Sequence, residues 1–278
     1  MRAGQFEEIR RSLADTGSYE TDARRAVAWF DRLLGWCDAW YYLRVFFEVM
    51  AGARVARRGV YTNDTWQRQS FEMLGIAEGC GARIRVSGMA DVMRTPGPKV
   101  FVSNHMSMLE TMLLPGILLV HGDVAFVVKR SLLRYPLFGA ILRAVRPVGV
   151  TRENAREDLK QVLSDGERFL RAGRSVILFP QRTRSADFVP DQFNTLGLKL
   201  ARRAEVSIVP VALKTDFVGI GRIWKDIGRL HRGRRVFFRF GEPHAPGDNG
   251  REAHAYCVRF IAGCLREWGA TVREISEG

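Results

Sequence analysis

The sequence predicts an α/β fold, in which a mainly parallel or mixed sheet is flanked by helices and preceded by an aromatic-rich helical segment at the N-terminus. From residue 83 onward, strand-like and helix-like stretches alternate, which is typical of an α/β layer fold. Some of the strand-like stretches are short continuous apolar runs, as in strands buried on both faces. The chain has 278 residues, of which 46% are hydrophobic, enough for one large domain or for one domain and a helical extension.

Residues 1 to 22 are polar and mixed in charge. They are expected to be weakly structured or to form a short polar helix. Their composition differs from that of a secretory signal, which needs a continuous apolar region.

Residues 23 to 60 differ because large aromatic and aliphatic side chains crowd into this short span. Charged residues interrupt it, so no apolar run reaches the roughly 18 residues that a membrane-spanning helix needs. Arginines flank the span, at Arg24 and Arg25 before it and at Arg54, Arg57 and Arg58 after it. This pattern predicts either a helix or helix pair lying in a membrane interface, or a helix packed on the protein's own core. We divide the chain accordingly into a helical, membrane-interface segment at residues 1–82 and an α/β domain at residues 83–278.

The elements of the α/β domain follow from periodicity and from turn residues. Alternating residues 83–86 predict an edge strand, and a turn at residues 95–98 leads into a strand at 100–102. Further strands are expected at residues 125–128, 175–179, 206–212 and 235–240. Helices are expected at residues 106–119, 156–172, 196–203 and 252–266.

The four cysteines, Cys37, Cys80, Cys257 and Cys264, match no zinc-binding spacing and are sparse for this chain length. We interpret them as reduced, structural thiols. Cys257 and Cys264 are seven residues apart, which places them on one face of the predicted C-terminal helix.

The formal net charge is +13, which favours a polyanionic partner such as nucleic acid, an anionic membrane surface or a phosphorylated substrate. No nucleic-acid-binding motif accompanies the charge, so no nucleic-acid partner is expected.

A candidate catalytic pair, His105 and Glu110, follows the strand expected at residues 100–102. Five residues is not the best spacing for a contact within a helix, where partners lie three or four residues apart. A contact therefore requires His105 to lie at or before the helix start. The carboxylate can then orient the imidazole through one ring nitrogen, while the other accepts a proton from a substrate hydroxyl. A surface histidine with an unrelated glutamate is the alternative.

A second candidate site follows the strand at residues 175–179 and comprises Gln181, Arg182, Thr183, Arg184 and Ser185. In an open α/β sheet, ligands bind at the carboxyl ends of the strands. Two arginines and two hydroxyl groups at that position can hold a phosphate. A solvated basic loop is the other interpretation.

The order and spacing of these motifs resemble those of the glycerophospholipid acyltransferase family, of the lysophosphatidic acid acyltransferase type. That family has an Asn-His-x-Ser-x-x-Asp block. Asn104, His105 and Ser107 match this block, and Glu110 stands in place of its aspartate.

Three further blocks of the family are found in the chain, and the resemblance covers roughly residues 83 to 220. Residues 179–185 match Phe-Pro-Glu-Gly-Thr-Arg-Ser except at Gln181 and Arg182. Residues 209–211 match an apolar strand that ends in Val-Pro-Val, and residues 150–152 weakly match an apolar stretch that ends in arginine.

The resemblance implies a glycerolipid acyltransferase-like fold and a reaction. A fatty acyl group would pass from an acyl thioester, acyl-CoA or acyl carrier protein, to a hydroxyl of a lysophospholipid-like acceptor. His105 would be the general base and Glu110 would orient it. No bound cofactor and no metal are implied, because the acyl carrier is a cosubstrate.

The resemblance also implies binding roles and a location. Arg152, Arg184 and Thr183 would contact the acceptor phosphate, and Asn104 and Ser107 would shape the loop. Gln181, Arg182 and Ser185 would also belong to the substrate-binding site. The protein would act at an anionic membrane surface, on the cytoplasmic side, as a peripheral or monotopic protein.

Three departures from the family pattern affect these expectations. Glutamate at 110 keeps the charge but moves it by about 1.5 Å, one C–C bond length. Gln181 and Arg182 make the expected acceptor pocket more cationic, which favours an acceptor with more negative charge or one other than lysophosphatidic acid. These departures also motivate an alternative function, a catalytically inactive lipid-binding protein that keeps the acyltransferase fold.

Overall fold

The computed structural model describes residues 3–22, 29–181, 183–222, 224–247 and 250–273. The strands of these residues are β1 (Tyr19–Glu20), β2 (Arg83–Ser87), β3 (Val100–Ser103), β4 (Val124–Lys129), β5 (Val148–Val150), β6 (Ser175–Leu178), β7 (Ile208–Lys214) and β8 (Arg235–Phe240).

The helices lie between and around these strands. The α-helices are α1 (Ala3–Thr16), α2 (Trp29–Leu34), α3 (Asp38–Arg57), α4 (Asn63–Gly79), α5 (Met89–Arg94), α6 (Leu109–Leu118), α7 (Phe138–Ala144), α8 (Ala155–Arg171), α9 (Leu196–Ala204) and α10 (Arg251–Glu267). Two short 3₁₀ helices are η1 (Arg130–Arg134) and η2 (Pro190–Gln192).

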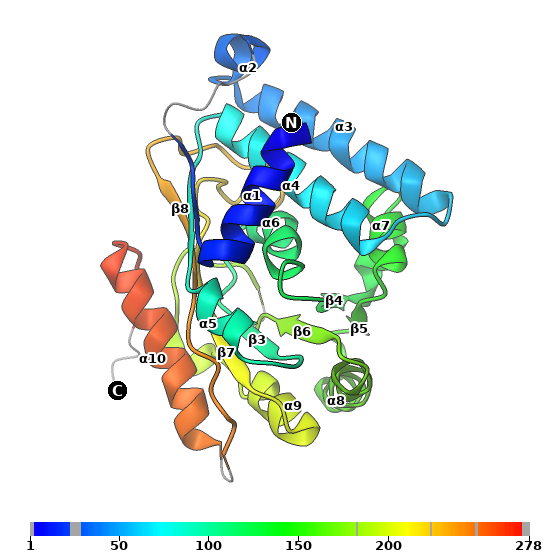
Figure 1. Cartoon of the computed structure of the whole chain (residues 1–278), viewed down its shortest axis with the longest axis vertical. Helices are drawn as coiled ribbons and strands as arrows, with labels where there is room; N and C mark the ends of the chain where they lie inside the picture. Colours follow the sequence, from blue (N-terminus) through cyan, green and yellow to red (C-terminus); the bar gives the residue numbers. More distant parts are fainter. Residues whose placement is uncertain (1–2, 23–28, 182, 223, 248–249, 274–278) are drawn as a thin grey trace.

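The strands form one mixed sheet of eight strands in the order β1-β2-β8-β7-β3-β6-β4-β5. Pairing is parallel except between β1 and β2 and between β7 and β8. Helices cover both faces, with α10 on one side of the sheet and α1, α4 and α6 on the other (Figure 1). The α/β fold with a mixed sheet flanked by helices is therefore confirmed.

The central strand β3 is buried along its whole length, as its apolar sequence predicts. Successive residues of a strand point to opposite faces, so β3 contributes to two cores. Phe101 belongs to a cluster with side chains of α1, α4 and α6. Val100 and Val102 belong to a second cluster with side chains of α8, α9 and α10. Residues on both sides of position 82 contribute to the first cluster.

Residues 3–22 form a helix, one of the two outcomes expected for this region, and a short strand that was not expected. Helix α1 buries Phe6, Ile9 and Leu13, whose spacing places them on one helix face. Strand β1 then pairs with the outer side of β2. The prediction that residues 83–86 form the edge strand is therefore wrong, because two residues of the N-terminal segment cover that edge.

Helix α6 begins at Leu109, three residues later than predicted, and this leaves residues 104–108 outside the helix. The helix contains Pro115, which cannot donate a backbone hydrogen bond. Ser70 of α4 inserts beside this point: its hydroxyl donates to the Met112 carbonyl (2.5 Å) and accepts the Gly116 N–H (2.8 Å). These bonds fix α6, and with it Glu110, against α4.

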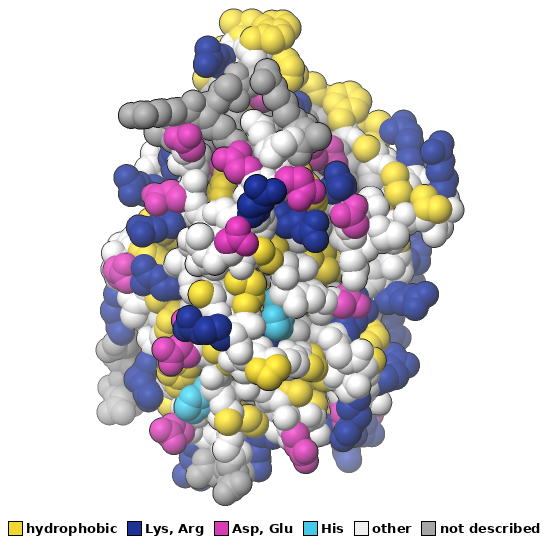
Figure 2. Space-filling model, viewed as in Figure 1, with side chains coloured by type: hydrophobic (Ala, Val, Ile, Leu, Met, Phe, Trp, Pro, Cys, Tyr) yellow, Lys and Arg dark blue, Asp and Glu magenta, His cyan; other side chains and the backbone are white. Residues whose placement is uncertain are grey.

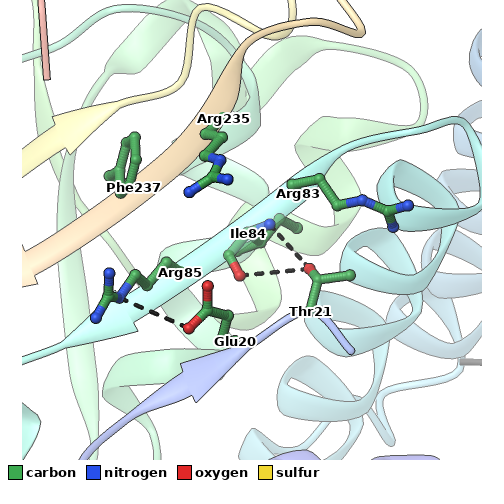
Figure 3. Close-up of a pocket in the computed structure, with 7 residues that line it drawn as sticks. All are labelled: Glu20, Thr21, Arg83, Ile84, Arg85, Arg235 and Phe237. Carbon is green, nitrogen blue, oxygen red and sulfur yellow. Dashed lines mark hydrogen bonds and ion pairs between the residues drawn. The ribbon is translucent and has the colours of Figure 1, made fainter. Parts of the chain in front are cut away.

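The outer part of the sheet carries a basic pocket of about 210 Å³ at the start of β2 and β8 (Figure 3). Arg83 and Arg235 lie opposite each other in the parallel register of these strands. Arg85 pairs loosely with Glu20, at 3.8 Å. Strands β8 and β7 separate β2 from β3, so this pocket is distinct from the site described below.

The aromatic-rich segment has features of both alternatives that the sequence left open, a helix packed on the core and a helix with exposed aromatic side chains. Helix α3 buries Tyr41 and Val45 against the core, whereas Phe46 and Phe47 on the same helix are about half exposed, at 48% and 54%. Trp29 and Trp36, beside this helix, are more than 70% exposed. Figure 2 shows hydrophobic side chains gathered over α2 and along α3.

Within the described ranges, no helix has both the length and the apolar character that crossing a membrane requires. Arg24 and Arg25, which the sequence analysis placed at one end of the aromatic-rich span, lie outside the described residues.

The four cysteines form no disulfide, as predicted. Cys257 and Cys264 are both buried on α10. Burial raises the pKa of the Cys257 thiol to about 12, so this side chain is a protonated packing group.

Candidate active site

The candidate site lies where the carboxyl ends of parallel strands meet. His105 follows β3, Gln181 follows β6, Arg152 follows β5 and Thr215 follows β7. Because these strands run in the same direction, their carboxyl ends share one edge of the sheet. The fold thus gathers residues that are up to 110 positions apart in the sequence.

Asn104 directs the chain out of the sheet. Its side-chain amide donates to the Leu213 carbonyl (2.7 Å), and its side-chain oxygen accepts the Leu213 N–H (2.8 Å). These two bonds replace the backbone pairing that a longer β3 would make with β7. Asn104 therefore fixes the start of the loop at residues 104–108 to β7.

The Glu110 carboxylate organises this loop. It lies at the start of α6, and its Oε1 accepts hydrogen bonds from His105 Nδ1 (2.8 Å) and the Met106 N–H (2.7 Å). Ser107 adds its backbone N–H, 2.8 Å from Oε1, and its hydroxyl, 2.9 Å from Oε2. The predicted contact between His105 and Glu110 is confirmed, and it forms because His105 precedes the helix.

Thr215 completes the environment of the carboxylate, and the sequence analysis missed this residue. Its hydroxyl donates to Glu110 Oε2 at 2.5 Å. Thr215 comes directly after β7, the strand that contains the Val-Pro-Val block, at the sheet edge where ligand-binding groups gather. Its position at the carboxyl end of a predicted strand is the sequence feature that could have identified Thr215.

Glu110 is ionised despite complete burial of its side chain. Burial alone would raise the pKa of the carboxyl group, but hydrogen bonds from His105 and Thr215 outweigh it and hold the pKa below its ordinary value. Oε1 of Glu110 lies 2.8 Å from His105 Nδ1, so the added methylene of glutamate does not displace the charge from the imidazole.

The His105 ring is held in one orientation with one nitrogen available for chemistry. A carboxylate only accepts hydrogen bonds, so Nδ1 carries the proton that faces Glu110 and Nε2 of the neutral ring is an acceptor. The ring stacks on Phe179 with centroids 4.3 Å apart and an angle of 21° between the planes. Its side chain is 14% exposed.

Gln181 and Ser185 join the second motif to the first. Gln181 is buried, and its side-chain oxygen accepts the His105 N–H (2.9 Å). The Ser185 N–H donates to the His105 carbonyl (2.9 Å). An amide oxygen accepts a backbone N–H as a carboxylate would, so glutamine keeps this bond without a buried charge.

Arg184 lies beside this junction but is paired with a carboxylate. Its Nη2 is 2.6 Å from Asp226 Oδ1, and its side chain is 20% exposed. Thr183 is exposed, and Arg182 lies outside the described residues. The third motif thus contributes one described arginine, already beside an acidic partner that the sequence analysis did not foresee.

Arg152 lies in a turn that Asp158 of α8 stabilises. The Thr151 and Arg152 N–H groups each donate to the Asp158 carboxylate at 2.7 Å. Arg152 has a positive φ of 65°, an uncommon conformation for a residue with a side chain. The backbone bonds to Asp158 hold it there.

A pocket of about 550 Å³ extends from the candidate site between the sheet and helices α8 and α9. Phe179 and Gln181, which contact His105, form part of its wall together with Arg152. Its apolar lining includes Val127, Val150, Val162, Leu178 and Leu196. The structure thus brings Arg152 and Gln181 to one pocket, next to the histidine.

Comparison with known proteins identifies relatives of this chain. Residues 83–214 match the family model described as Acyltransferase. The chain is 28% identical over 206 residues to 1-acyl-sn-glycerol-3-phosphate acyltransferase of Pseudomonas aeruginosa, covering 74% of this chain and 75% of the relative. It is 34% identical over 209 residues to lyso-ornithine lipid O-acyltransferase of Rhizobium meliloti, covering 73% of this chain and 61% of the relative. The match thus spans less than two thirds of the length of the second relative.

A solved structure shares the fold. The crystal structure of the 1-acyl-sn-glycerophosphate acyltransferase PlsC from Thermotoga maritima superposes with a TM-score of 0.61 at 20% identity, covering 86% of this chain and 96% of that chain. The match to the Acyltransferase family model and the similarity to these two relatives confirm the family resemblance noted in the sequence, and the solved structure confirms the fold.

The lowered pKa of Glu110 predicts how the site contributes to stability. A carboxyl group whose pKa is depressed in the folded protein stabilises it above the unfolded pKa, and this contribution is lost as pH falls through the folded pKa. Glu110→Gln places an amide NH₂ among several donors, so we expect it to reduce the free energy of unfolding by about 3 kcal/mol at neutral pH. The difference should shrink below about pH 4.5, the ordinary value for glutamate.

Urea unfolding of both proteins between pH 7 and pH 3 measures this difference. A difference that stays constant over the whole range would contradict an ionised, hydrogen-bonded Glu110.

Proposed function

We propose that this chain, which matches the Acyltransferase family model through residues 83–214, transfers a fatty acyl group from an acyl thioester to a hydroxyl of a lyso-lipid, with His105 and Glu110 as the catalytic pair. The observation that carries this proposal is the Glu110–His105 hydrogen bond, which leaves Nε2 of the imidazole as an acceptor. Phe179 and Gln181, which contact His105, line the neighbouring pocket.

The proposed reaction needs one base and no covalent acyl-enzyme. Nε2 of His105 accepts the proton of the acceptor hydroxyl while its oxygen attacks the thioester carbonyl. Glu110 stabilises the imidazolium that forms, as the third member of a catalytic triad does. The tetrahedral intermediate then expels the thiolate, which takes the proton from His105. The products are the acylated lipid and the free thiol, and the histidine returns to its neutral form.

The 550 Å³ pocket is suited to part of an amphiphilic substrate. Its aliphatic wall provides apolar surface for an acyl chain, and Arg152 and Lys199 lie among its lining residues. Anionic groups of the donor or acceptor can bind these cations. Acyl-CoA and acyl carrier protein both supply a thioester, and the chemistry of His105 is the same with either.

The inactive lipid-binding alternative rests on the departures at Glu110, Gln181 and Arg182, of which Arg182 lies outside the described residues. The structure describes the other two, Glu110 and Gln181. Both side chains are buried, and both make the hydrogen bonds that hold His105 in place. A protein without catalysis does not require these costly buried polar contacts, so we favour the active enzyme.

Replacing the proposed base tests this function directly. His105→Ala should reduce acyl transfer from a long-chain acyl thioester to lyso-lipids by about 10²- to 10⁴-fold, the usual contribution of general base catalysis. The assay measures acylated product across a panel of lyso-lipids. His254→Ala, which removes a histidine on α10, is the control and should leave the rate unchanged.

Equal rates for wild type and His105→Ala would exclude the proposed role of His105. Absence of transfer by the wild type with every donor and acceptor would instead favour the lipid-binding alternative.

We further propose that the protein works at the cytoplasmic surface of a membrane, bound through α2 and α3. Aromatic rings are exposed to solvent at Trp29 on α2, at Phe46 and Phe47 on α3, and at Trp36 between the two helices. Aromatic side chains next to arginines suit the interface of an anionic bilayer. The loop between β7 and β8 is fixed to α3 by Tyr42, whose hydroxyl donates to the Gly228 carbonyl (2.5 Å).

Vesicle cosedimentation tests the membrane proposal. The wild type should bind vesicles containing anionic phospholipid, and the combined variant Trp36→Ser, Phe46→Ser, Phe47→Ser should bind at least about tenfold more weakly, because burying one large apolar side chain is worth about 1.5–3 kcal/mol. The thermal unfolding midpoint is the control and should not fall, since these side chains are exposed. Unchanged vesicle binding by the variant would rule out this surface as the membrane contact.

A further inference from the structure

The ion pair between Arg184 and Asp226 has a consequence for the acceptor, provided that the proposed function holds. Arg184 directly precedes Ser185, whose backbone N–H donates to the His105 carbonyl, so the backbone of this arginine is one residue from a contact with the proposed base. Asp226 Oδ1 is 2.6 Å from Arg184 Nη2, and 51% of the aspartate side chain is exposed. The Asp226 carboxylate is thus paired with Arg184 and is still accessible to a substrate.

The position of Asp226 is built into the fold. The segment between β7 and β8 closes on itself through a bridge between Val218 and Leu230. Tyr42 of α3 clamps Gly228, two residues after the aspartate, by donating to its carbonyl and accepting its N–H (2.9 Å). Asp38 of α3 accepts the Leu230 N–H at 3.1 Å. A bridge within the loop and hydrogen bonds to two residues of α3 therefore hold the loop that carries Asp226.

The charges at this point disfavour a phosphate monoester. Such a group carries about −1.5 to −2 at neutral pH and would meet the Asp226 carboxylate next to the arginine that binds it. Gln181 adds no positive charge, and its oxygen accepts the His105 N–H. The expectation of a more cationic acceptor pocket therefore does not extend to Arg184, because Asp226 balances its charge.

A headgroup with both charges fits this pair better. Arginine has five N–H donors and one carboxylate accepts at most two of them in a bidentate pair, so Arg184 can hold a second anion while Asp226 remains bound. Asp226 has acceptor capacity for an ammonium group at the same time. An amino-acid headgroup provides a carboxylate and an ammonium within one small unit.

We infer that Asp226 is a specificity-determining residue, and that with Arg184 it selects a lyso-lipid acceptor whose headgroup carries a cation beside an anion over one that ends in a phosphate monoester. The headgroup anion binds Arg184 and the headgroup ammonium donates to Asp226. Arg184 and Asp226 thus bind the headgroup, while His105 accepts the proton of the acceptor hydroxyl.

Acyl transfer to two acceptors, lyso-ornithine lipid and lysophosphatidic acid, tests this inference with an acyl-coenzyme A or acyl carrier protein donor at saturation. For the wild type we expect kcat/KM to be at least about tenfold higher with lyso-ornithine lipid, the effect of one charge-assisted hydrogen bond. Asp226→Asn should raise KM for lyso-ornithine lipid by about tenfold, lower KM for lysophosphatidic acid and leave both kcat values within about twofold. Asp226→Glu, which restores the charge, should restore the preference for lyso-ornithine lipid.

Asp64→Asn is the matched control, because Asp64 also forms an ion pair with an arginine, Arg68 at 2.9 Å, but on helix α4. It should leave the preference unchanged. A wild type that prefers lysophosphatidic acid, or an Asp226→Asn variant with the wild-type ratio, would overturn the inference while leaving the proposed function intact. An equal loss with both acceptors would also overturn it, since Asp226 would then only hold the loop. Absence of transfer to either acceptor by the wild type would contradict the proposed function itself, and the inference with it.

Discussion

The buried carboxylate of Glu110 is the interaction on which the rest of the site depends. It accepts hydrogen bonds from the loop after β3, from the imidazole of His105 and from Thr215 after β7. An ionised group is costly to bury, and it is stable here only because several donors surround it. Those donors follow two different strands, β3 and β7. The sheet must therefore form before the carboxylate can accept all of these hydrogen bonds. The fold and the orientation of the imidazole are therefore coupled through one side chain.

Two of the three departures from the family motifs, at residues 110 and 181, have a common physical explanation. Glutamate at 110 reaches the imidazole because α6 starts only at Leu109, one residue before it, and the preceding loop folds back over the carboxylate. Glutamine at 181 retains an oxygen for the His105 N–H without adding a second buried negative charge near Glu110. Both residues thus preserve the geometry of the histidine. The chain differs from the family pattern in residue type more than in the contacts that these residues make.

Much of the fold could be predicted because β3 and β6 are short apolar runs, and a buried parallel strand requires this pattern. The His105–Glu110 contact could also be predicted, since a five-residue spacing permits it only before a helix. The packing of helix α1 was not predicted, because its three buried apolar side chains are separated by polar residues in the sequence. Asp226 could not be found from the sequence, since a loop 42 residues beyond Arg184 carries it and only tertiary structure brings the two charges together.

The protonation of His105 tests the central claim most directly. ¹⁵N NMR of the imidazole groups, with the His105 signals assigned by their loss in a His105→Gln variant, reports which ring nitrogen carries the proton. With Glu110 as hydrogen-bond acceptor, the neutral ring must be protonated at Nδ1 and unprotonated at Nε2. That tautomer at neutral pH is the result we predict. A ring protonated at Nε2 alone would contradict the account, because it could neither donate to Glu110 nor accept a proton from a substrate hydroxyl.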